Sequence, residues 1–261
     1  MNCKICSSTS QPFAHGVVLQ KHRVSYFKCK NCGFVQTEEP YWLNEAYSEA
    51  INLSDVGLVS RNIRFAKIAK ALIAAFFNSD GRFIDYGAGY GLFVRMMRDL
   101  GYDFCWHDRY CENLFAKGFE SAQVGADHFE LLTAFELFEH FTTPQKDIAE
   151  MLKLSRNILF STELLPAAMP KPGDWWYYGL EHGQHISLFT HKSLSILAEQ
   201  YDLNFYSNGT SVHLFTDKRI SSLIFKLFTH YKLALLLDIV VNKRSLVQDD
   251  YASLTKSSTR V

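Results

Sequence analysis

A short strand pattern followed by a glycine-rich loop places the strongest limit on how this chain folds. Residues 82–86, RFIDY, predict a buried strand, and the next five residues read Gly-Ala-Gly-Tyr-Gly. Residues 92–100, LFVRMMRDL, predict a helix that stops at Gly101, and YDFCWHD predicts a second strand that ends at Asp108. Strand, glycine loop, helix, strand and acid in this order are typical of a nucleotide-binding α/β fold with a mostly parallel, Rossmann-like sheet.

The spacing of the glycines indicates which nucleotide the loop binds. A dinucleotide fingerprint requires Gly or Ala three residues after the second glycine, where this chain has Leu92. The D-x-G-x-G-x-G pattern instead suits a nucleoside without a pyrophosphate, with Asp108 accepting hydrogen bonds from both ribose hydroxyls and Asp85 attracting an ammonium group. These are the needs of S-adenosylmethionine, and the expected cofactor residues are Asp85, Tyr86, Gly87, Ala88, Gly89, Gly91 and Asp108. A nicotinamide oxidoreductase and an ordinary tight turn are the alternatives.

These motifs resemble those of the class I S-adenosylmethionine-dependent methyltransferases, from about Phe83 to Phe215. FIDYGAGYG, WHD and FELLTAFELFEHF carry the resemblance. The last motif is similar to the family's fourth strand and the segment after it, which implies that Phe135 packs against the cofactor. The polar residues that follow are then expected at the rim, where they contact the substrate: Glu136, Glu139 and His140. Only a short segment precedes this strand, so the third strand is not assigned.

Four cysteines near the N-terminus form two closely spaced pairs. Each pair reads Cys-x-x-Cys, and two such pairs match a closed tetrahedral zinc site with the ligands Cys3, Cys6, Cys29 and Cys32. We expect residues 1–40 to form a zinc ribbon with hairpins in residues 7–28, and residues 41–261 to form the methyltransferase domain with C-terminal helices. A disulfide pair is the alternative, which a reducing cytosol disfavours. Four thiolates leave no position for water, so the expected zinc is structural.

A long loop over residues 164–190 is expected to meet the substrate. Proline and glycine residues interrupt it, and long ordered loops in compact domains are usually functional. The loop leaves the carboxyl end of a strand, the edge at which open α/β sheets bind ligands. Four consecutive aromatic residues in it suit a sugar or a planar ring: Trp175, Trp176, Tyr177 and Tyr178. Core packing is the alternative for each of them.

The same loop offers histidines that can act as the catalytic base. Methyl transfer to a hydroxyl or a carbon acid requires removal of a proton, and His182 and His185 titrate in the right range. QHISLFT resembles the H-E-H-x-S-Y-F-S segment of zinc-containing sugar C-methyltransferases, a resemblance that implies a sugar acceptor and carbohydrate biosynthesis. Gly183 and Gln184 replace the first His and the Glu of that segment, so O-methylation with His185 as base is an equal alternative. The Glu-His pair at the rim is another candidate base, and a structural role for His185 also stays open.

The remaining patterns complete this fold. Residues 61–77 predict an amphipathic helix that covers the sheet, and residues 144–153 predict a helix before a strand at 157–164. Residues 191–202 predict a helix after the long loop. LNFYS and TSVHLFTD then predict two strands around a two-residue turn, Asn208-Gly209, in which both residues need a positive φ. An antiparallel hairpin at the end of a mostly parallel sheet is a feature of the class I methyltransferase fold.

The connecting and terminal segments carry weaker sequence patterns. Residues 40–60 form a linker, and Arg61 or Arg64 beyond it either reaches the cofactor carboxylate or belongs to a solvated helix face. Residues 220–241 predict an apolar helix that packs on the core or forms a homodimer face. Residues 252–261 are expected to be frayed.

Charge and apolar content narrow the choice of function. Lys plus Arg number 27 and Asp plus Glu also number 27, so the formal net charge is zero. This balance disfavours tight binding to nucleic acid and makes an RNA-base methyltransferase, with the ribbon gripping RNA, the weaker alternative. A non-catalytic binding protein on the same scaffold is a further alternative. We find no secretory signal and no apolar run long enough to span a bilayer, and therefore expect a cytoplasmic methyltransferase for a sugar, a nucleotide-sugar or another small molecule.

Overall fold

The computed structural model describes residues 1–48, 55–124, 128–230 and 242–258, which belong to two compact units. The first unit comprises Met1–Ser54, Phe135–Leu152 and Phe160–Arg219. The second unit comprises Asp55–Ala134, Lys153–Leu159 and Ile220–Val261. The domain boundary at residue 40 stays a prediction, as does the linker over residues 40–60, part of which lies outside the described residues.

Six strands form the larger sheet, in the order β5-β4-β6-β7-β10-β9. Their bounds are β4 Arg82–Tyr86, β5 Asp103–His107, β6 Leu131–Ala134, β7 Ile158–Ser161, β9 Asn204–Ser207 and β10 Val212–Thr216. β4 pairs in parallel with β5 and with β6, whereas β9 and β10 pair antiparallel. Side chains of β6 and β7 are buried throughout, because both faces of a parallel sheet are covered. The expected α/β fold with a mostly parallel sheet and a terminal hairpin is therefore confirmed.

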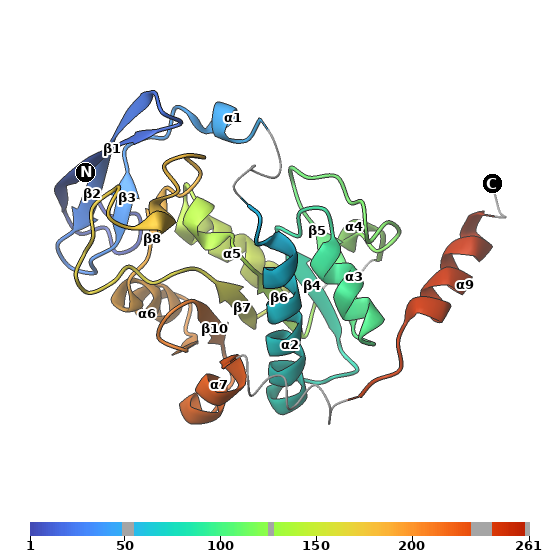
Figure 1. Ribbon diagram of the computed structural model, residues 1–261. Helices are drawn as coiled ribbons and strands as arrows, with labels where there is room; N and C mark the ends of the chain where they lie inside the picture. Colours follow the sequence, from blue (N-terminus) through green and yellow to red (C-terminus); the bar gives the residue numbers. More distant parts are fainter. Residues whose placement is uncertain (49–54, 125–127, 231–241, 259–261) are drawn as a thin grey trace. The chain divides into compact units, whose positions relative to one another are not determined.

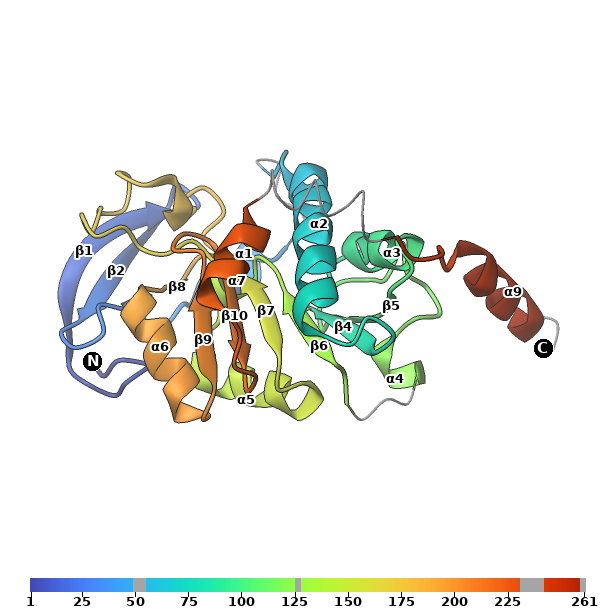
Figure 2. The same ribbon diagram turned by 90° about the horizontal axis from the view of Figure 1, so that it is seen from below.

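The second unit holds the strand–loop–helix–strand segment that the sequence predicted. The helix after the glycine loop is α3, Leu92–Asp99, and the helix expected before the first strand is α2, Leu58–Phe76. α2 buries a continuous apolar face, and Figure 2 shows it crossing beside β4 and β6. In the described part of the segment between β5 and β6 there is the short helix α4, Ser121–Val124, and an isolated bridge between Trp106 and Glu120, but no third strand.

The C-terminal residues of the second unit are more ordered than expected. α7 spans Ser222–Thr229, and residues 231–241, which include the remainder of the expected apolar helix, lie outside the described residues. The prediction of a frayed end from residue 252 is wrong for residues 252–258, which belong to α9, Val247–Ser258. A buried Asp250 holds this helix, because its carboxylate accepts hydrogen bonds of 2.9 and 2.7 Å from the guanidinium of Arg98. A homodimer through the C-terminal helices stays a prediction.

The chain regions that the structure describes contain no helix with the length and apolar character needed to cross a membrane.

The first unit contains a four-stranded antiparallel sheet that the long loop completes. Its order is β1-β2-β3-β8, with bounds β1 Ser10–Val18, β2 His22–Cys29, β3 Val35–Thr37 and β8 Ser187–Leu188. β1 and β2 confirm the predicted hairpin, whereas β8 comes from the long loop and pairs with β3 (Figure 1). Under this sheet lies a core that includes Val24, Tyr26, Trp42, Tyr177, Tyr178 and Ile186. The long loop is therefore an integral part of the N-terminal sheet and its core.

The helices α5 Pro144–Leu154 and α6 His191–Gln200 confirm the two helices that the sequence predicted there. The short helix α1 Leu43–Ala46 and the 3-10 turns η1 Phe138–His140 and η2 Trp176–Tyr178 were not predicted. α6 begins with a capping box, in which the Thr190 hydroxyl accepts from the Ser193 backbone N–H and the Ser193 hydroxyl accepts from the Thr190 N–H.

The turn between β9 and β10 differs from the prediction. His213 pairs with Ser207, so the connection is longer than two residues, and only Gly209 has a positive φ, of 89°. The side-chain oxygen Oδ1 of Asn208 instead accepts from the backbone N–H groups of residues 210, 211 and 212. Asn208 thus forms the turn with its side chain rather than with a left-handed backbone.

Candidate active site

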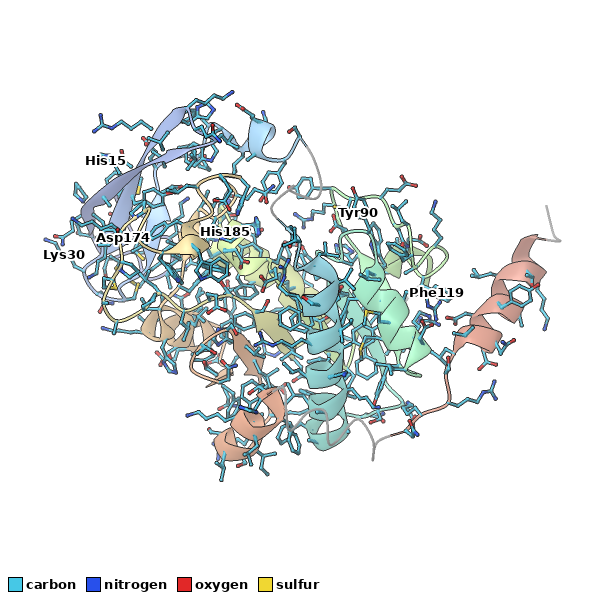
Figure 3. The ribbon with its side chains drawn as sticks, in the orientation of Figure 1. His15, Lys30, Tyr90, Phe119, Asp174 and His185 are labelled. Atoms are coloured by element: carbon cyan, nitrogen blue, oxygen red, sulfur yellow. The ribbon has the colours of Figure 1, made fainter. Side chains whose placement is uncertain are left out.

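The glycine loop between β4 and α3 adopts the backbone that its composition requires. Gly87, Gly89 and Gly91 have φ values of 73°, 53° and 86°, which side chains other than glycine rarely adopt. A Cβ at Gly89 would meet no atom within 4 Å, so the loop faces open space there. Figure 3 labels Tyr90 in this loop. An exposed backbone with open space beside it fits the close approach of a bound nucleoside.

Two contacts with β5 hold the loop in place. The His107 carbonyl accepts from the backbone N–H groups of Gly87 and Ala88 at 2.9 and 3.2 Å. The Trp106 indole donates to the Gly89 carbonyl at 2.8 Å. The ring of Tyr86, another predicted cofactor residue, is buried and stacks on His107 at 4.7 Å, so its side chain serves packing.

Asp108 lies directly after β5 and its carboxylate is joined to the loop. One oxygen accepts from the Gly89 N–H at 2.9 Å, and the other accepts from the N–H groups of Tyr110 and Cys111 at 2.7 and 2.9 Å. Three backbone donors therefore orient this acid. The loop and the acid, which the sequence predicted to act together, do lie together.

Asp85 is the fourth residue of β4, and its side chain is buried. Its carboxylate accepts a hydrogen bond of 2.6 Å from the Thr133 hydroxyl. Burial, and then the charge of Asp108, raise the pKa of Asp85 to about 7. A carboxyl group in this state becomes ionised when a cation binds beside it, which agrees with the predicted attraction of an ammonium group.

We expect cofactor affinity to rise with pH through the titration of Asp85. The raised pKa of about 7 means that the acid is mostly protonated at pH 6 and mostly ionised at pH 7.5. Only the ionised form attracts a cation, so affinity for S-adenosylmethionine should increase about fivefold or more over this interval. Titration calorimetry at both pH values measures it. Asp85→Asn should give a flat profile, and the same rise in that variant would contradict the assignment.

Arg61, for which the sequence left two roles open, pairs with an acid of its own unit, and its role toward the cofactor stays a prediction. Its guanidinium forms an ion pair of 2.7 Å with Asp55 on the same unit.

The segment after β6 carries the second group of predicted residues, which belongs to the first unit. Phe135 is half-buried, and Glu136 has a positive φ of 52°, an uncommon conformation for a residue with a side chain. Ser161 stabilises it, because its hydroxyl accepts from the Glu136 N–H at 2.7 Å and donates to the Glu136 carboxylate at 2.5 Å.

Glu139 is not at a rim, as the resemblance implied, but fully buried. Its exposed fraction is 0%, and neither carboxylate oxygen has a hydrogen-bond partner among the described residues. Burial, and then the negative charge of Glu136, raise the pKa of Glu139 to about 8. The adjacent His140 has an Nε2 atom 4.0 Å from this carboxylate, and its Nδ1 is bonded to the Tyr47 hydroxyl at 2.9 Å. Burial lowers the pKa of His140 to about 3, with a further contribution from His182.

His185, labelled in Figure 3, joins Glu139 and His140 in one cluster. The ligand atoms of the three side chains all lie within 4.8 Å of one another. The imidazole of His185 has Nδ1 2.6 Å from the carbonyl oxygen of Tyr177. Since a carbonyl only accepts, Nδ1 carries the proton in the neutral ring and Nε2 is the basic nitrogen. His182 stacks edge-on against His185 at 4.7 Å.

Backbone contacts explain why residues so far apart in sequence meet here. The Ile186 N–H donates to the Glu139 carbonyl at 2.9 Å, and the Ser187 hydroxyl donates to the Phe141 carbonyl at 2.7 Å. Both donors sit at or beside β8, so the strand that completes the N-terminal sheet also places His185 beside Glu139. Sequence spacing contains no signal for this pairing.

Gly183 and Gln184, the two departures from the sugar C-methyltransferase segment, have structural roles. Gly183 has a φ of 68°, and a Cβ there would come within 3.2 Å of the Trp42 ring. The Gln184 amide donates to the Ala46 carbonyl at 2.7 Å, which a carboxylate could not do. Both residues therefore attach the loop to the segment around α1.

The four aromatic residues of the loop have different environments. Tyr178 is fully buried, packs edge-on against Tyr26 and donates to the Pro170 carbonyl at 2.8 Å. Tyr177 is also buried, whereas Trp176 is 73% exposed and Trp175 is half-buried. A ring enclosed by the core has no face for a ligand, so packing narrows the predicted acceptor platform to the two tryptophans.

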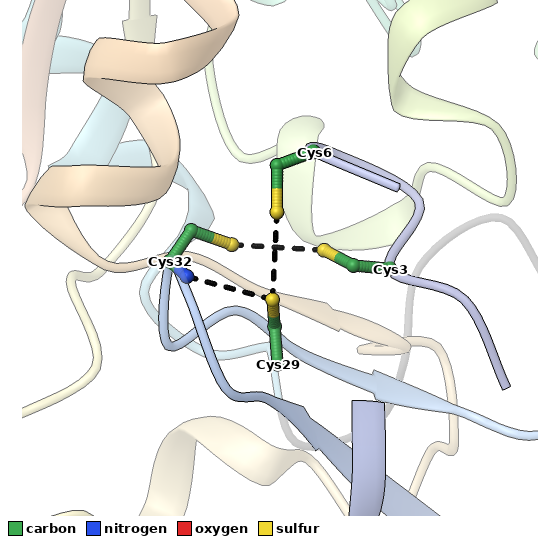
Figure 4. A group of neighbouring side chains, drawn as sticks. All are labelled: Cys3, Cys6, Cys29 and Cys32. Carbon is green, nitrogen blue, oxygen red and sulfur yellow. Dashed lines mark hydrogen bonds between the residues drawn. The ribbon is translucent and has the colours of Figure 1, made fainter. Parts of the chain in front are cut away.

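The four N-terminal cysteines converge on one point (Figure 4). The Sγ atoms of Cys3 and Cys32 are 3.6 Å apart, and those of Cys6 and Cys29 are 3.5 Å apart. A disulfide needs about 2.05 Å, so neither pair is bonded. An ion with four bonds of about 2.3 Å to sulfur at tetrahedral angles has its sulfurs about 3.8 Å apart, which is close to the observed spacing. The cluster could therefore hold a metal ion.

Comparison with known proteins places most of this framework in one family. A family model described as a methyltransferase domain matches residues 60–208. No curated protein matches the sequence.

Several solved structures are similar at low sequence identity. A methyltransferase from Thermotoga maritima, described as a possible histamine N-methyltransferase, is 11% identical with a TM-score of 0.39, over 62% of this chain and 92% of that one. CalO1, a methyltransferase of calicheamicin biosynthesis with SAH bound, is 16% identical with a TM-score of 0.41, over 69% and 60%. An O-methyltransferase family 2 protein from Planctomyces limnophilus, in complex with apigenin, is 14% identical with a TM-score of 0.45, over 67% and 65%.

The family match covers more than half of the chain and includes both the glycine loop and Asp108. The chain thus belongs to the methyltransferase domain family and is an S-adenosylmethionine-dependent methyltransferase.

Proposed function

We propose that this enzyme methylates a hydroxyl group of a sugar or nucleotide-sugar, with His185 as the base. The orientation of the His185 ring carries the proposal, because the bond from Nδ1 to the Tyr177 carbonyl leaves Nε2 as the proton acceptor. The two tryptophans of the loop supply aromatic faces of the kind that bind sugar rings. Gly183 and Gln184 stand where the sugar C-methyltransferases have His and Glu, which favours an oxygen acceptor.

In the proposed reaction, different residues of this chain bind the cofactor and accept the proton. S-adenosylmethionine, when bound, supplies an electrophilic methyl group on a sulfonium sulfur. Gly89 admits the nucleoside, Asp108 accepts from the ribose hydroxyls, and Asp85 attracts the ammonium group. The bound cofactor would supply the methyl group to the acceptor oxygen and would keep the electron pair of the broken carbon–sulfur bond. His185 Nε2 takes the hydroxyl proton.

We also propose that the four cysteines hold a structural zinc ion. Their Sγ spacing fits a tetrahedral site, and all four residues belong to the turns at the ends of β1, β2 and the N-terminal segment. Four thiolates complete the coordination of the ion, so no water is activated there. The ion instead joins the N-terminal turn to the turn after β2.

Incubation with isotopically labelled S-adenosylmethionine and a panel of sugars, nucleotide-sugars and RNA transcripts tests the acceptor class. Mass spectrometry should find label on a sugar hydroxyl, and nuclear magnetic resonance of the product should place it on oxygen. Label on RNA would contradict the proposal and support the RNA alternative. Label on a sugar carbon would refute the oxygen acceptor.

With the acceptor in hand, His185→Ala should lower kcat about 100-fold or more, the usual contribution of a general base. Affinity for S-adenosylmethionine should stay within about twofold, because His185 is not among the residues assigned to the cofactor. The matched control is His15→Ala, which removes an exposed histidine of β1 and should leave kcat unchanged. A fully active His185→Ala enzyme would rule the residue out as the base.

A further inference from the structure

We propose that Glu139, His140 and His185 bind a divalent transition-metal ion, at a second metal site that is separate from the four cysteines. The three side chains offer one carboxylate oxygen and two imidazole nitrogens, all within 4.8 Å of one another. Two ligands of one ion lie at most about twice the metal–ligand distance of about 2.1 Å apart. The separation of 4.0 Å between His140 Nε2 and the Glu139 carboxylate falls within that span. The other separations, of up to 4.8 Å, would have to shorten by at most about 0.6 Å when an ion binds.

The environment of Glu139 is the first independent support. A carboxylate with an exposed fraction of 0% and no hydrogen-bond partner among the described residues is costly to bury. The hydroxyls of Thr162 and Tyr177, which are bonded to each other at 3.2 Å, lie close enough to lower the pKa of Glu139, but neither makes a hydrogen bond of normal geometry to its carboxylate. Glu136 adds further negative charge beside Glu139. A bound cation would balance this charge and complete the coordination of the carboxylate.

The orientation of the two imidazoles is the second support. Histidines that bind metals usually have their other ring nitrogen held by a second partner, which fixes the tautomer and the ring plane. His185 has this arrangement, with Nδ1 at 2.6 Å from the Tyr177 carbonyl. His140 has it too, with Nδ1 at 2.9 Å from the Tyr47 hydroxyl. The carbonyl partner of His185 leaves its Nε2 as the ligand atom. In His140, Nε2 is the atom beside Glu139 and is the ligand atom in the tautomer whose Nδ1–H donates to the Tyr47 hydroxyl.

The ligand set indicates the kind of ion and its use. Two imidazoles and one carboxylate suit Zn²⁺, Co²⁺, Fe²⁺ or Mn²⁺, and not Ca²⁺, which prefers oxygen ligands alone. Three protein ligands leave coordination positions open, in contrast to the four-cysteine cluster. An ion with open positions can polarise a bound acceptor hydroxyl. This inference rests on the proposed hydroxyl acceptor but replaces the role of His185 in it. With the ion bound, His185 Nε2 is a ligand and not the base, and the ion lowers the pKa of the acceptor hydroxyl instead.

Cobalt binding tests the site without requiring methyl transfer. The full chain is loaded with one equivalent of Zn²⁺ to fill the four thiolates, freed of unbound zinc, and then titrated with Co²⁺ by calorimetry and absorption spectroscopy. We expect one Co²⁺ per chain, without the intense thiolate charge-transfer band that binding to cysteine would produce. Glu139→Gln, which preserves shape, and His185→Ala should each weaken Co²⁺ binding at least about tenfold. His15→Ala is the matched control and should bind as the unaltered protein does.

Three results would overturn the metal site: no cobalt beyond the zinc-filled cysteines, cobalt that shows the thiolate band, or unchanged affinity in Glu139→Gln. Circular dichroism of each variant confirms that it is folded, and Glu139→Gln keeps the test decisive if His185→Ala does not fold. The proposed function fails separately, through the acceptor panel. Cobalt binding without any methylated sugar would remove the sugar acceptor alone, and methylation without cobalt binding would remove the metal site alone.

Discussion

Replacing Asp108 with alanine should weaken S-adenosylmethionine binding about 100-fold or more. Two hydrogen bonds from ribose hydroxyls to a carboxylate contribute about 1.5–3 kcal/mol each, and about 1.4 kcal/mol corresponds to a factor of ten. The structure adds a second reason, since Asp108 also accepts from the N–H groups of Gly89, Tyr110 and Cys111. The substitution therefore loosens the glycine loop as well. Titration calorimetry measures the dissociation constant.

Two further variants separate the effects of Asp108. Asp108→Asn keeps one acceptor oxygen for the Gly89 N–H but loses the negative charge. Its affinity for S-adenosylmethionine should therefore lie between that of the unaltered protein and that of Asp108→Ala. Asp80→Ala removes an exposed acid of the same unit, which pairs with Lys243, and is the control for charge alone. Unchanged affinity in Asp108→Ala would show that the nucleoside binds elsewhere.

Removing one thiolate of the N-terminal cluster should cost the first unit much of its stability. Structural zinc sites contribute about 10 kcal/mol or more to folding. Cys6→Ser should therefore lower the zinc content by one ion per chain and lower the melting temperature of the first unit by about 10 °C or more. Cys6 is the least buried of the four ligands, so lost packing adds little to the effect. Atomic emission spectrometry and calorimetry measure the two quantities.

A control within the chain distinguishes zinc binding from general thiol chemistry. Cys111→Ser changes another half-buried free cysteine, which lies in the second unit outside the cluster. Its zinc content should equal that of the unaltered protein. A Cys6→Ser protein that kept both its zinc and its melting temperature would show that the cluster is not a structural metal site.

The sequence predictions were accurate where an element depends on residues close together in the sequence, and less accurate where it depends on distant residues. The strands β4 and β5, the helix α3 and the glycine loop were located correctly because each depends on residues within a short window. The β9–β10 turn was wrong in detail, because the Asn208 side chain bonds three backbone N–H groups where a two-residue backbone turn was expected. The prediction of a frayed C-terminal end was wrong, because the ion pair of Asp250 with Arg98 joins residues that are far apart in the sequence.

The residues of the candidate site also divide into those that a local sequence pattern predicts and those that depend on distant segments. Asp85 and Asp108 were predicted from their places near the ends of strands, and the structure places both acids beside the glycine loop. The burial of Glu139 was missed, because the family motif shows which residue types follow the strand but not which of them the chain covers. Tyr178 was expected to contact the acceptor, and its burial against Tyr26 became visible only when β8 joined the N-terminal sheet.

The amino-acid sequence alone determined the α/β framework, the glycine loop with the acid beside it and the four-cysteine cluster. Each arises from backbone conformations and spacings within a few residues, so local composition is enough to specify it. Tertiary structure decided that β8 pairs with β3, and that this pairing brings His185 to Glu139 and His140. Such a cluster depends on hydrogen bonds and packing between distant segments, whose free energy exists only once the chain has folded.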